Sequence, residues 1–312
     1  MVMKKIWPVE WVILTYMAFT VLLMICWWDS LVNPLQMLIT RGQTLLLMAV
    51  MWAVYQWRPC RLTHFLRIAG LMLTLSWFYP DTYELNRVLP NLDHIFAGFE
   101  QKLFHCQPSL LFSQQCPWGW FSELMCLGYV SYFPLMVVIL LYYFFFRYRS
   151  FDRAAYILIS SFYIYYVIFV LLPVTGPQFY YLAVGVEKIA AGIFPSIGDF
   201  FLTHSERMAS PGWSDGFFYH LLEITHNAGE RPTAAFPSSH VGVTTVMMLL
   251  ACQTRSKRLV FSMLPFYVLM CFATVYIYAH YAIDVFAGLI SGIIIYVVLR
   301  FRAKKNGTPL SS

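Results

Sequence analysis

Two short stretches of the chain gather residue types that handle phosphate. The first, residues 231 to 240, combines a guanidinium, hydroxyls and an imidazole just before a long apolar run. The second, from His280 to Asp284, reads His-Tyr-Ala-Ile-Asp and also stands at the start of an apolar run. Arginine binds phosphate through paired hydrogen bonds, and histidine serves as nucleophile, base or acid. The two stretches therefore predict phosphoryl chemistry, provided that the fold brings them together.

The spacing of His280 and Asp284 predicts that they share one face of a helix, because residues four apart are one turn from each other. Asp284 then lies deeper in the apolar region, where an unpaired carboxylate is costly and a hydrogen bond to the imidazole would satisfy it. That bond would fix the tautomer of His280 and leave its other nitrogen free as nucleophile or base. The alternatives are a structural helix–helix hydrogen bond for Asp284 and no chemical task for His280.

The Pro-Ser-Ser run that precedes His240 predicts the start of a helix, because proline favours the first turn and serine caps it. The free N–H groups of a helix N-terminus attract anions. We therefore assign Ser238, Ser239 and Arg231 to phosphate binding and His240 to acid–base work. The alternatives are ordinary capping by one of the serines and pairing of Arg231 with a carboxylate of the same loop.

The composition is that of an integral membrane protein. Of the 312 residues, 60% are hydrophobic and only 12% are charged, a balance that a soluble fold cannot bury. The placement of the net charge of +6 is more informative than its sum, and nucleic acid is not an expected partner. The first apolar run, residues 11 to 28, lacks a small-residue cleavage site, so we expect a retained span rather than a cleaved signal.

Several apolar runs are long enough to cross, or nearly cross, about 30 Å of hydrocarbon. They lie near residues 9–28, 43–57, 64–79, 122–146, 155–175, 237–253, 259–278 and 281–299. No internal repeat or low-complexity tract divides the chain. We therefore predict an all-α, polytopic transmembrane helix bundle of about eight spans that forms a single membrane domain over residues 1–312.

The basic residues predict that both termini are cytoplasmic, because cytoplasmic loops of membrane proteins are rich in Lys and Arg. With that orientation most of the 21 Lys and Arg residues fall inside, Lys4 and Lys5 among them. Those left outside are Arg41, Arg87, Lys102, Lys188, Arg207 and Arg231. The long loops 80–121 and 176–236 are then extracytoplasmic, and the catalytic motifs within 231–284 meet at the outer face.

The outer loops also hold cysteines and histidines. Cys106 and Cys116 share the first loop and could close a small disulfide in an oxidising compartment, two unpaired thiols being the alternative. His204, His220 and His226 lie in the second loop without the carboxylate or thiol pattern of a metal site, so we interpret them as surface histidines. We expect neither a metal nor another cofactor.

The motifs resemble the three signature motifs of the type-2 phosphatidic acid phosphatase superfamily, in order and with fitting spacing. The matching residues are Arg231-Pro232, the run from Pro237 to His240, and His280 with Asp284. The His-Tyr-x-x-Asp form, and Gly176-Pro177 followed by aromatics, are most similar to its inositol-phosphorylceramide synthase and sphingomyelin synthase branch. The likeness covers the C-terminal part of the chain well and the first outer loop loosely, and it implies a six-helix phosphatase-like core.

Two places depart from the superfamily pattern. Ile224 stands where the pattern has a lysine, seven residues before the Arg-Pro arginine, and Ala273 and Thr274 stand where it has Ser-Arg before the third-motif histidine. Two cations that would hold a doubly charged phosphate monoester are therefore absent. A phosphodiester carries one charge, for which one arginine and helix N–H groups suffice. The departures favour headgroup transfer over monoester hydrolysis, unless Lys188 or Arg207 replaces a missing cation.

The resemblance implies a membrane-embedded lipid phosphotransferase. His280, oriented by Asp284, would attack phosphorus and form a phosphohistidine. His240 would protonate the leaving alkoxide and then activate the acceptor hydroxyl, while Arg231 and Ser239 hold the non-bridging oxygens. We expect a phosphoinositol-like headgroup to move to a lipid alcohol such as ceramide at the extracytoplasmic face.

Two other functions stay open. With water as acceptor the same groups would form a phosphatase for a phosphatidate-, phosphatidylglycerophosphate- or polyprenyl-phosphate-like lipid. A lipid or ion carrier would need ionisable residues through the membrane depth, whereas Glu10, Glu123 and Asp284 lie near span ends. The expected partners are membrane lipids, and the sequence leaves the oligomeric state open. The expected location is a bacterial inner membrane, with the active site on the periplasmic side.

Overall fold

The computed structural model describes residues 6–305, and within them the fold is all-helical, as predicted. Lys4 and Lys5, which entered the orientation argument, lie outside the described residues. A helix or a pair of helices stands at each of the predicted apolar runs. These are α1 (Pro8–Cys26), α2 (Pro34–Trp57), α3 (Arg61–Asn86), α6 (Gly119–Val130), α7 (Tyr132–Phe146), α8 (Phe151–Leu171), α12 (Ser239–Gln253), α13 (Lys257–Tyr276) and α14 (Ala282–Lys305).

Five of these helical segments are long and apolar enough to cross a membrane: α1, α2, the segment Tyr148–Leu171 that contains α8, α13 and α14. The pair α6 and α7 is bent by 43° and makes a sixth if it crosses as one unit. The helix α12 is apolar but has only 15 residues, and α3 is not among the candidates. The structure thus supports a membrane bundle, and the count of eight spans stays a prediction.

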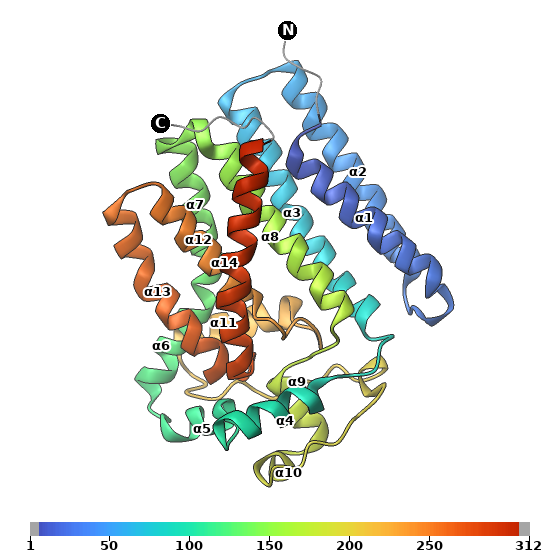
Figure 1. Cartoon of the computed structure of the whole chain (residues 1–312), viewed down its shortest axis with the longest axis vertical. Coiled ribbons are helices and arrows are strands. Elements are labelled where there is room, and N and C mark those ends of the chain that lie inside the picture. The colour runs from blue at the N-terminus through green and yellow to red at the C-terminus, as the bar shows by residue number, and fades with distance from the viewer. Residues whose placement is uncertain (1–5, 306–312) are drawn as a thin grey trace.

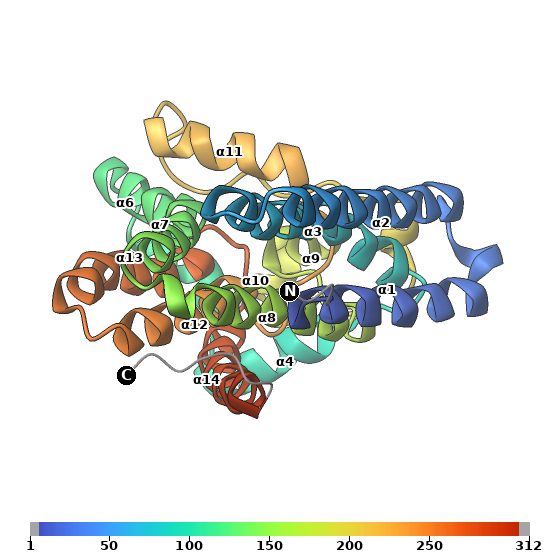
Figure 2. The same ribbon diagram turned by 90° about the horizontal axis from the view of Figure 1, so that it is seen from above.

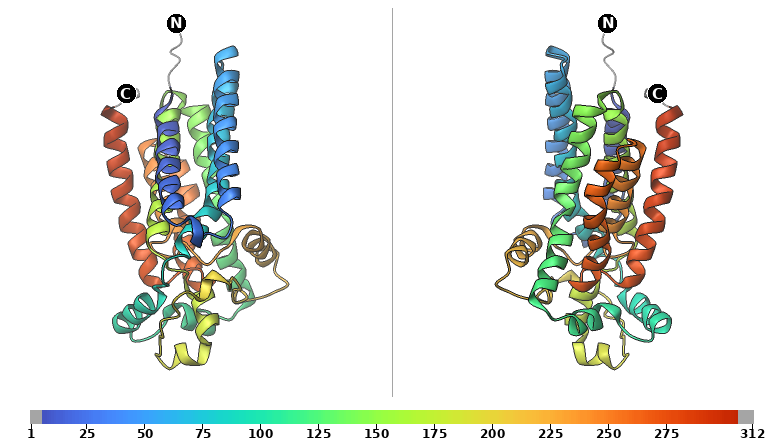
Figure 3. Two further views of the ribbon diagram at one scale, coloured as in Figure 1. Left: turned by 90° about the vertical axis from the view of Figure 1, so that its right-hand side faces the viewer. Right: turned by 90° about the vertical axis from the view of Figure 1, so that its left-hand side faces the viewer.

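The two ends of the bundle differ in their structure. The start of α1 and the end of α14 lie at one end, and the segments predicted to be extracytoplasmic gather at the other (Figure 1). Those segments fold into short helices: α4 (Asp93–Phe104), α5 (Pro108–Gln115), α9 (Pro177–Val184), α10 (Val186–Ala190) and α11 (Phe217–Gly229). The helix α11 packs on α6 and lies outside the bundle in views from above and from the side (Figures 2 and 3).

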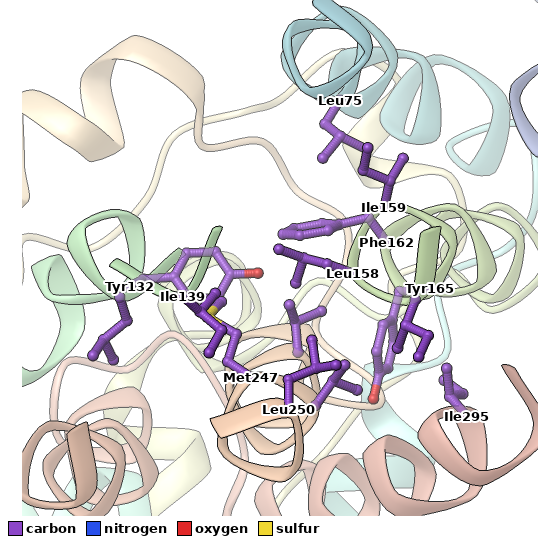
Figure 4. Close-up of a cluster of buried hydrophobic side chains, with 14 of the residues drawn as sticks. Leu75, Tyr132, Ile139, Leu158, Ile159, Phe162, Tyr165, Met247, Leu250 and Ile295 are labelled. Atoms are coloured by element: carbon purple, nitrogen blue, oxygen red, sulfur yellow. The ribbon is translucent and has the colours of Figure 1, made fainter. Parts of the chain in front are cut away.

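The helix α8 forms the centre of the bundle. Most of it is buried, 78% of its most apolar window, because it is apolar on every side and is surrounded by other helices. Figure 4 shows its side chains among those of α3, α7, α12 and α14. The labelled residues are Leu158, Ile159, Phe162 and Tyr165 of α8, with Leu75, Tyr132, Ile139, Met247, Leu250 and Ile295 around them.

The helices α12 and α14 approach each other closely because glycines line their contact. A Cβ on Gly292 would lie 2.5 Å from the Gly242 carbonyl oxygen, and one on Gly288 would lie 2.6 Å from the Ser238 carbonyl oxygen. Small residues let membrane helices pack backbone to backbone. This contact holds the N-terminus of α12 against the first turns of α14, where the two predicted motifs stand.

Two buried ion pairs join the first three helices. The Arg67 guanidinium binds Glu10 through Nε (2.8 Å) and Nη2 (2.6 Å) and lies 3.7 Å from the centre of the Trp7 ring. Arg41 Nη1 lies 2.7 Å from Asp81 Oδ2. Because each buried charge has a partner, these polar residues can lie between apolar helices.

Candidate active site

The Pro-Ser-Ser run does start a helix, and Ser238 is its N-cap. The fully buried Ser238 Oγ accepts a hydrogen bond from the Val241 N–H at 3.3 Å. Ser239 opens the helix α12 and is partly exposed. His240 follows in the first turn, partly exposed, with the rings of Tyr129 and Tyr132 packed on its imidazole at 4.6 and 4.7 Å between centroids.

His280 lies in the short connection between α13 and α14, and its side chain meets His240. The His280 backbone N–H donates to the Thr274 carbonyl at 2.9 Å, and the residue is only 3% exposed. Its Nε2 lies 3.5 Å from His240 Nδ1, and the two ring centroids are 5.7 Å apart. The fold therefore brings the two predicted motifs into one site.

The tautomer of His280 is set by the main chain. His280 Nδ1 lies 2.8 Å from the Ala235 carbonyl oxygen, which can only accept, so Nδ1 carries the proton. That leaves the lone pair of Nε2 directed at the site. The backbone at Ala235 is fixed in turn by a hydrogen bond from the Ala235 N–H to the Val174 carbonyl at 3.0 Å.

The predicted hydrogen bond from His280 to Asp284 is not formed, which corrects the expectation for this pair. The Asp284 Oδ2 is 3.5 Å from His280 Nδ1, and it accepts instead from the Tyr281 N–H at 2.9 Å. The carboxyl turns back onto the start of its own helix, where free N–H groups attract it. Asp284 thus orients the turn that carries His280 and adds electrostatic support at 3.5 Å.

Burial keeps His280 neutral at physiological pH. It lowers the pKa of His280 to about 4, while the Ala235 carbonyl and the nearby Glu230 carboxyl act in the opposite direction. A neutral imidazole with a free Nε2 is the nucleophilic form.

Arg231 stands in the loop before α12, partly exposed, with its Nη1 donating to the Glu230 carbonyl at 2.8 Å. Within residues 6–305 it forms no ion pair, so the alternative of a side-chain ion pair in the same loop is not realised. The structure places no hydrogen bond between the described atoms of Arg231 and either histidine. The carboxyls of Glu230 and Glu84 lie within electrostatic range of its guanidinium.

A buried carboxylate behind the site was missed by sequence reasoning. Asp93, at the start of α4, is fully buried and accepts hydrogen bonds on both oxygens. The donors are Asn91 Nδ2 (2.6 Å), Thr175 N (2.7 Å), Thr175 Oγ1 (2.9 Å), Gly176 N (2.8 Å) and Tyr281 Oη (3.0 Å). Asp93 thereby ties the loop after α8 to Tyr281, the residue that follows His280.

Gly176 makes this arrangement sterically feasible. Its φ of 90° lies in the region that favours glycine, and a Cβ there would lie 2.6 Å from the Ala279 carbonyl oxygen. The Gly176-Pro177 pair therefore allows its loop to approach the His280 turn closely.

Glu100, on α4, is a second carboxyl that the sequence did not reveal. It is fully buried, and its Oε2 accepts from the Ile283 N–H at 3.1 Å, at the start of α14. Burial raises the pKa of Glu100 to about 8, an effect that the Ile283 N–H opposes and the Asp284 charge reinforces. A neutral Glu100 can stand near Asp284 without a second negative charge.

The positions where cations were absent lie in different environments. Ile224 is 65% exposed on α11, on the side opposite to the buried His226, so it points away from the site. Ala273 and Thr274 are fully buried next to His280. Of the two possible replacements, Arg207 is bound to Glu223 at 2.6 Å, and Lys188 is exposed on α10.

The remaining histidines and cysteines divide between surface and interior. His204 and His220 are exposed, as predicted, but His226 is only 1% exposed, because the inner face of α11 carries it onto the Tyr129 ring. Cys106 and Cys116 are both free thiols, so the disulfide alternative is not realised. No group of three or more metal-ligating side chains is placed to hold a metal ion in the described part of the chain.

Comparison with known proteins gives one match. A family model described as the PAP2 superfamily matches residues 95–298, more than half of the chain and all of the predicted site residues. This agrees with the resemblance at the level of the superfamily. No curated protein and no solved structure matches the chain.

Proposed function

The chain belongs to the PAP2 superfamily, and on this premise we propose that it transfers the phospho-headgroup of a phosphodiester lipid to a lipid alcohol. Membership makes the protein a lipid enzyme of phosphatase or phosphotransferase type. The observation that carries the chemistry is the facing pair of imidazole nitrogens, His280 Nε2 and His240 Nδ1, at 3.5 Å. This proximity supports a two-histidine mechanism, in which His280 attacks phosphorus and His240 transfers protons.

In the first step the His280 Nε2 lone pair attacks phosphorus and forms an N–P bond. The bond between phosphorus and the glycerol oxygen of the donor lipid breaks, and its electron pair leaves with that oxygen. His240 gives the departing oxygen a proton. Arg231, the Ser239 hydroxyl and the N–H groups of the capped α12 terminus neutralise the non-bridging oxygens.

In the second step the acceptor lipid alcohol gives its proton to His240 while its oxygen attacks phosphorus. The N–P bond breaks and His280 regains its lone pair. The Ala235 carbonyl stabilises the imidazole through both steps, because Nδ1 carries its proton throughout. The Asp284 carboxyl stabilises positive charge on the His280 ring from 3.5 Å, and its hydrogen bond with the Tyr281 N–H holds the turn in place.

The charge near the site favours a diester over a monoester. Among the described residues Arg231 forms no ion pair, Arg207 is neutralised by Glu223, and the Glu230 carboxyl lies close enough to His280 to affect its pKa. A doubly charged phosphate bound by Arg231 would also meet this nearby carboxyl. A singly charged diester matches this balance better.

We extend the proposal to the inositol-phosphorylceramide synthase and sphingomyelin synthase branch, with ceramide or a similar alcohol as acceptor. The location we propose is the extracytoplasmic face of a bacterial inner membrane. The His-Tyr-x-x-Asp form of the third motif and the Gly176-Pro177 pair followed by aromatics support this branch.

The test uses purified full-length protein in detergent with lipid donors labelled in the phosphate. Transfer of label to ceramide is expected, and it should fall by about 10³-fold or more in His280→Gln and by about 10²–10⁴-fold in His240→Gln. His220→Gln, which changes an exposed histidine of the outer loop 176–236, is the matched control. Release of inorganic phosphate from a monoester without transfer would instead favour the phosphatase, and intact transfer in His280→Gln would refute His280 as the nucleophile.

A further inference from the structure

Gln178 has a buried acceptor without a partner close to the nucleophile. The residue lies in the first turn of α9 and is 1% exposed. Its main chain is fixed by two hydrogen bonds, from its N–H to the Tyr278 carbonyl (2.8 Å) and from the Met208 N–H to its carbonyl (2.8 Å). Its Nε2 donates to Glu230 Oε1 at 2.9 Å, whereas its Oε1 has no partner among residues 6–305.

Glu230 supplies further acceptor capacity at the same place. It follows α11, where its N–H donates to the His226 carbonyl at 2.8 Å. The bond from Gln178 goes to Oε1, and Oε2 accepts no hydrogen bond from the described residues. Burial raises the pKa of Glu230, and the first of the opposing influences is His280, so the carboxyl lies within electrostatic range of the nucleophile.

His226 completes the set from one turn earlier on α11. It is 1% exposed, and neither ring nitrogen has a partner in the described part of the chain. The Tyr129 ring contacts both His226 (5.4 Å) and His240 (4.6 Å), so His226 stands beside the general acid. Burial lowers the pKa of His226 to about 3, which leaves one N–H donor and one acceptor nitrogen.

Buried polar atoms without partners are rare in folded proteins, because leaving them unpaired is costly. Here they occur at Gln178 of α9 and at His226 of α11, and the partly exposed Glu230, which follows α11, adds a carboxylate oxygen beside Gln178. Acceptors predominate among them. A ligand group that donates hydrogen bonds would satisfy most of the set at once.

We infer that Gln178, Glu230 and His226 form a headgroup subsite for a phosphodiester whose alcohol part donates hydrogen bonds. The shared chemistry is an O–H or N–H donor a few bonds from phosphorus, supplied by a polyol or by a primary ammonium. A quaternary ammonium has no such donor and leaves the acceptors unpaired. The inference rests on the proposed function for its location, but its test is a binding measurement that needs no turnover.

The test measures binding of glycerophosphoinositol, glycerophosphoethanolamine and glycerophosphocholine to the purified protein. These probes share the diester and the glycerol hydroxyls, and they differ only in the donors of the headgroup. The first or second is expected to bind more tightly than the third, and Gln178→Met should weaken that preferred probe by about 3- to 10-fold and leave the choline probe unchanged. Glu230→Gln should weaken an ammonium probe by about 10-fold or more and a polyol less, which separates the two sources.

Gln253→Met, which changes a glutamine bonded to Tyr296 away from the site, is the matched control and should alter no affinity. Equal binding of all three probes, or an equal loss for all three in Gln178→Met, would overturn the subsite. A headgroup preference without any headgroup transfer would reject the proposed function while the subsite stands. Headgroup transfer without any preference in binding would reject the subsite while the proposed function stands.

Discussion

Replacing Asp93 with asparagine should loosen the turn that carries His280. Oδ1 of Asp93 accepts from Gly176 N and Tyr281 Oη, and Oδ2 accepts from Asn91 and Thr175. In Asp93→Asn the best orientation puts the amide nitrogen at Oδ1. Tyr281 can then turn its hydroxyl to accept, but the Gly176 N–H loses its partner.

The expected cost follows from these contacts. One buried N–H without a partner costs about 1–3 kcal/mol, and the remaining bonds lose the added strength of a charged acceptor. The smaller desolvation cost of a neutral amide offsets part of this. We expect a net loss of about 2–4 kcal/mol in the free energy of unfolding and, because Tyr281 adjoins His280, a fall in kcat of about 10- to 100-fold.

A double-mutant cycle distinguishes this network from a general loss of stability. Thermal unfolding in detergent and kcat are measured for wild type, Asp93→Asn, Tyr281→Phe and the double variant. Because both residues share one hydrogen bond, Tyr281→Phe should cost less in the Asp93→Asn background than alone. Effects that add within about 0.5 kcal/mol, or an Asp93→Asn protein with unchanged unfolding and kcat, would refute the reasoning.

Three further outcomes follow from the structure. Because burial lowers the pKa of His280 to about 4, this imidazole, the nucleophile of the proposed mechanism, stays neutral until the pH falls to that value. The acid limb of kcat/KM should therefore have its midpoint near pH 4, and a midpoint near 6.5 would contradict this. Gly292→Ala places a Cβ 2.5 Å from the Gly242 carbonyl oxygen, so it should reduce the free energy of unfolding by about 1–3 kcal/mol and also reduce activity. Gly98→Ala is the control, because a Cβ there has nothing within 4 Å, and it should change neither stability nor activity. Arg67→Met should destabilise by about 3–5 kcal/mol because it leaves Glu10 buried and unpaired, and adding Glu10→Gln should recover part of that loss in the same unfolding assay.

The sequence predicted those parts of the fold that depend on local patterns. The apolar runs marked the long helices, although the run 122–146 is broken between α6 and α7. The Pro-Ser-Ser run marked the start of α12, and the motif spacing marked His240 and His280, which do meet at 3.5 Å. The short helices of the outer loops were not predicted, because they are held by contacts with segments far along the chain.

The parts of the site that depend on tertiary contacts could not be predicted. Nothing near Asp93 or Glu100 in the sequence indicates that the start of α14 lies beside them. His226 was interpreted as a surface residue because its burial depends on which side of α11 faces the bundle. The prediction that His280 bonds to Asp284 was wrong for a similar reason, because the observed partner, the Ala235 carbonyl, is 45 residues away along the chain.

The hydrogen bond from His280 to the Ala235 carbonyl has a consequence for how this site can change during evolution. A main-chain oxygen is present whichever side chain position 235 carries, so no single substitution there can delete the acceptor. Scanning mutagenesis of side chains would therefore overlook the group that fixes the proton on Nδ1 of His280. What must be preserved is the course of the backbone from Arg231 to Pro237, and insertions or deletions in that segment should be far less tolerated than replacements.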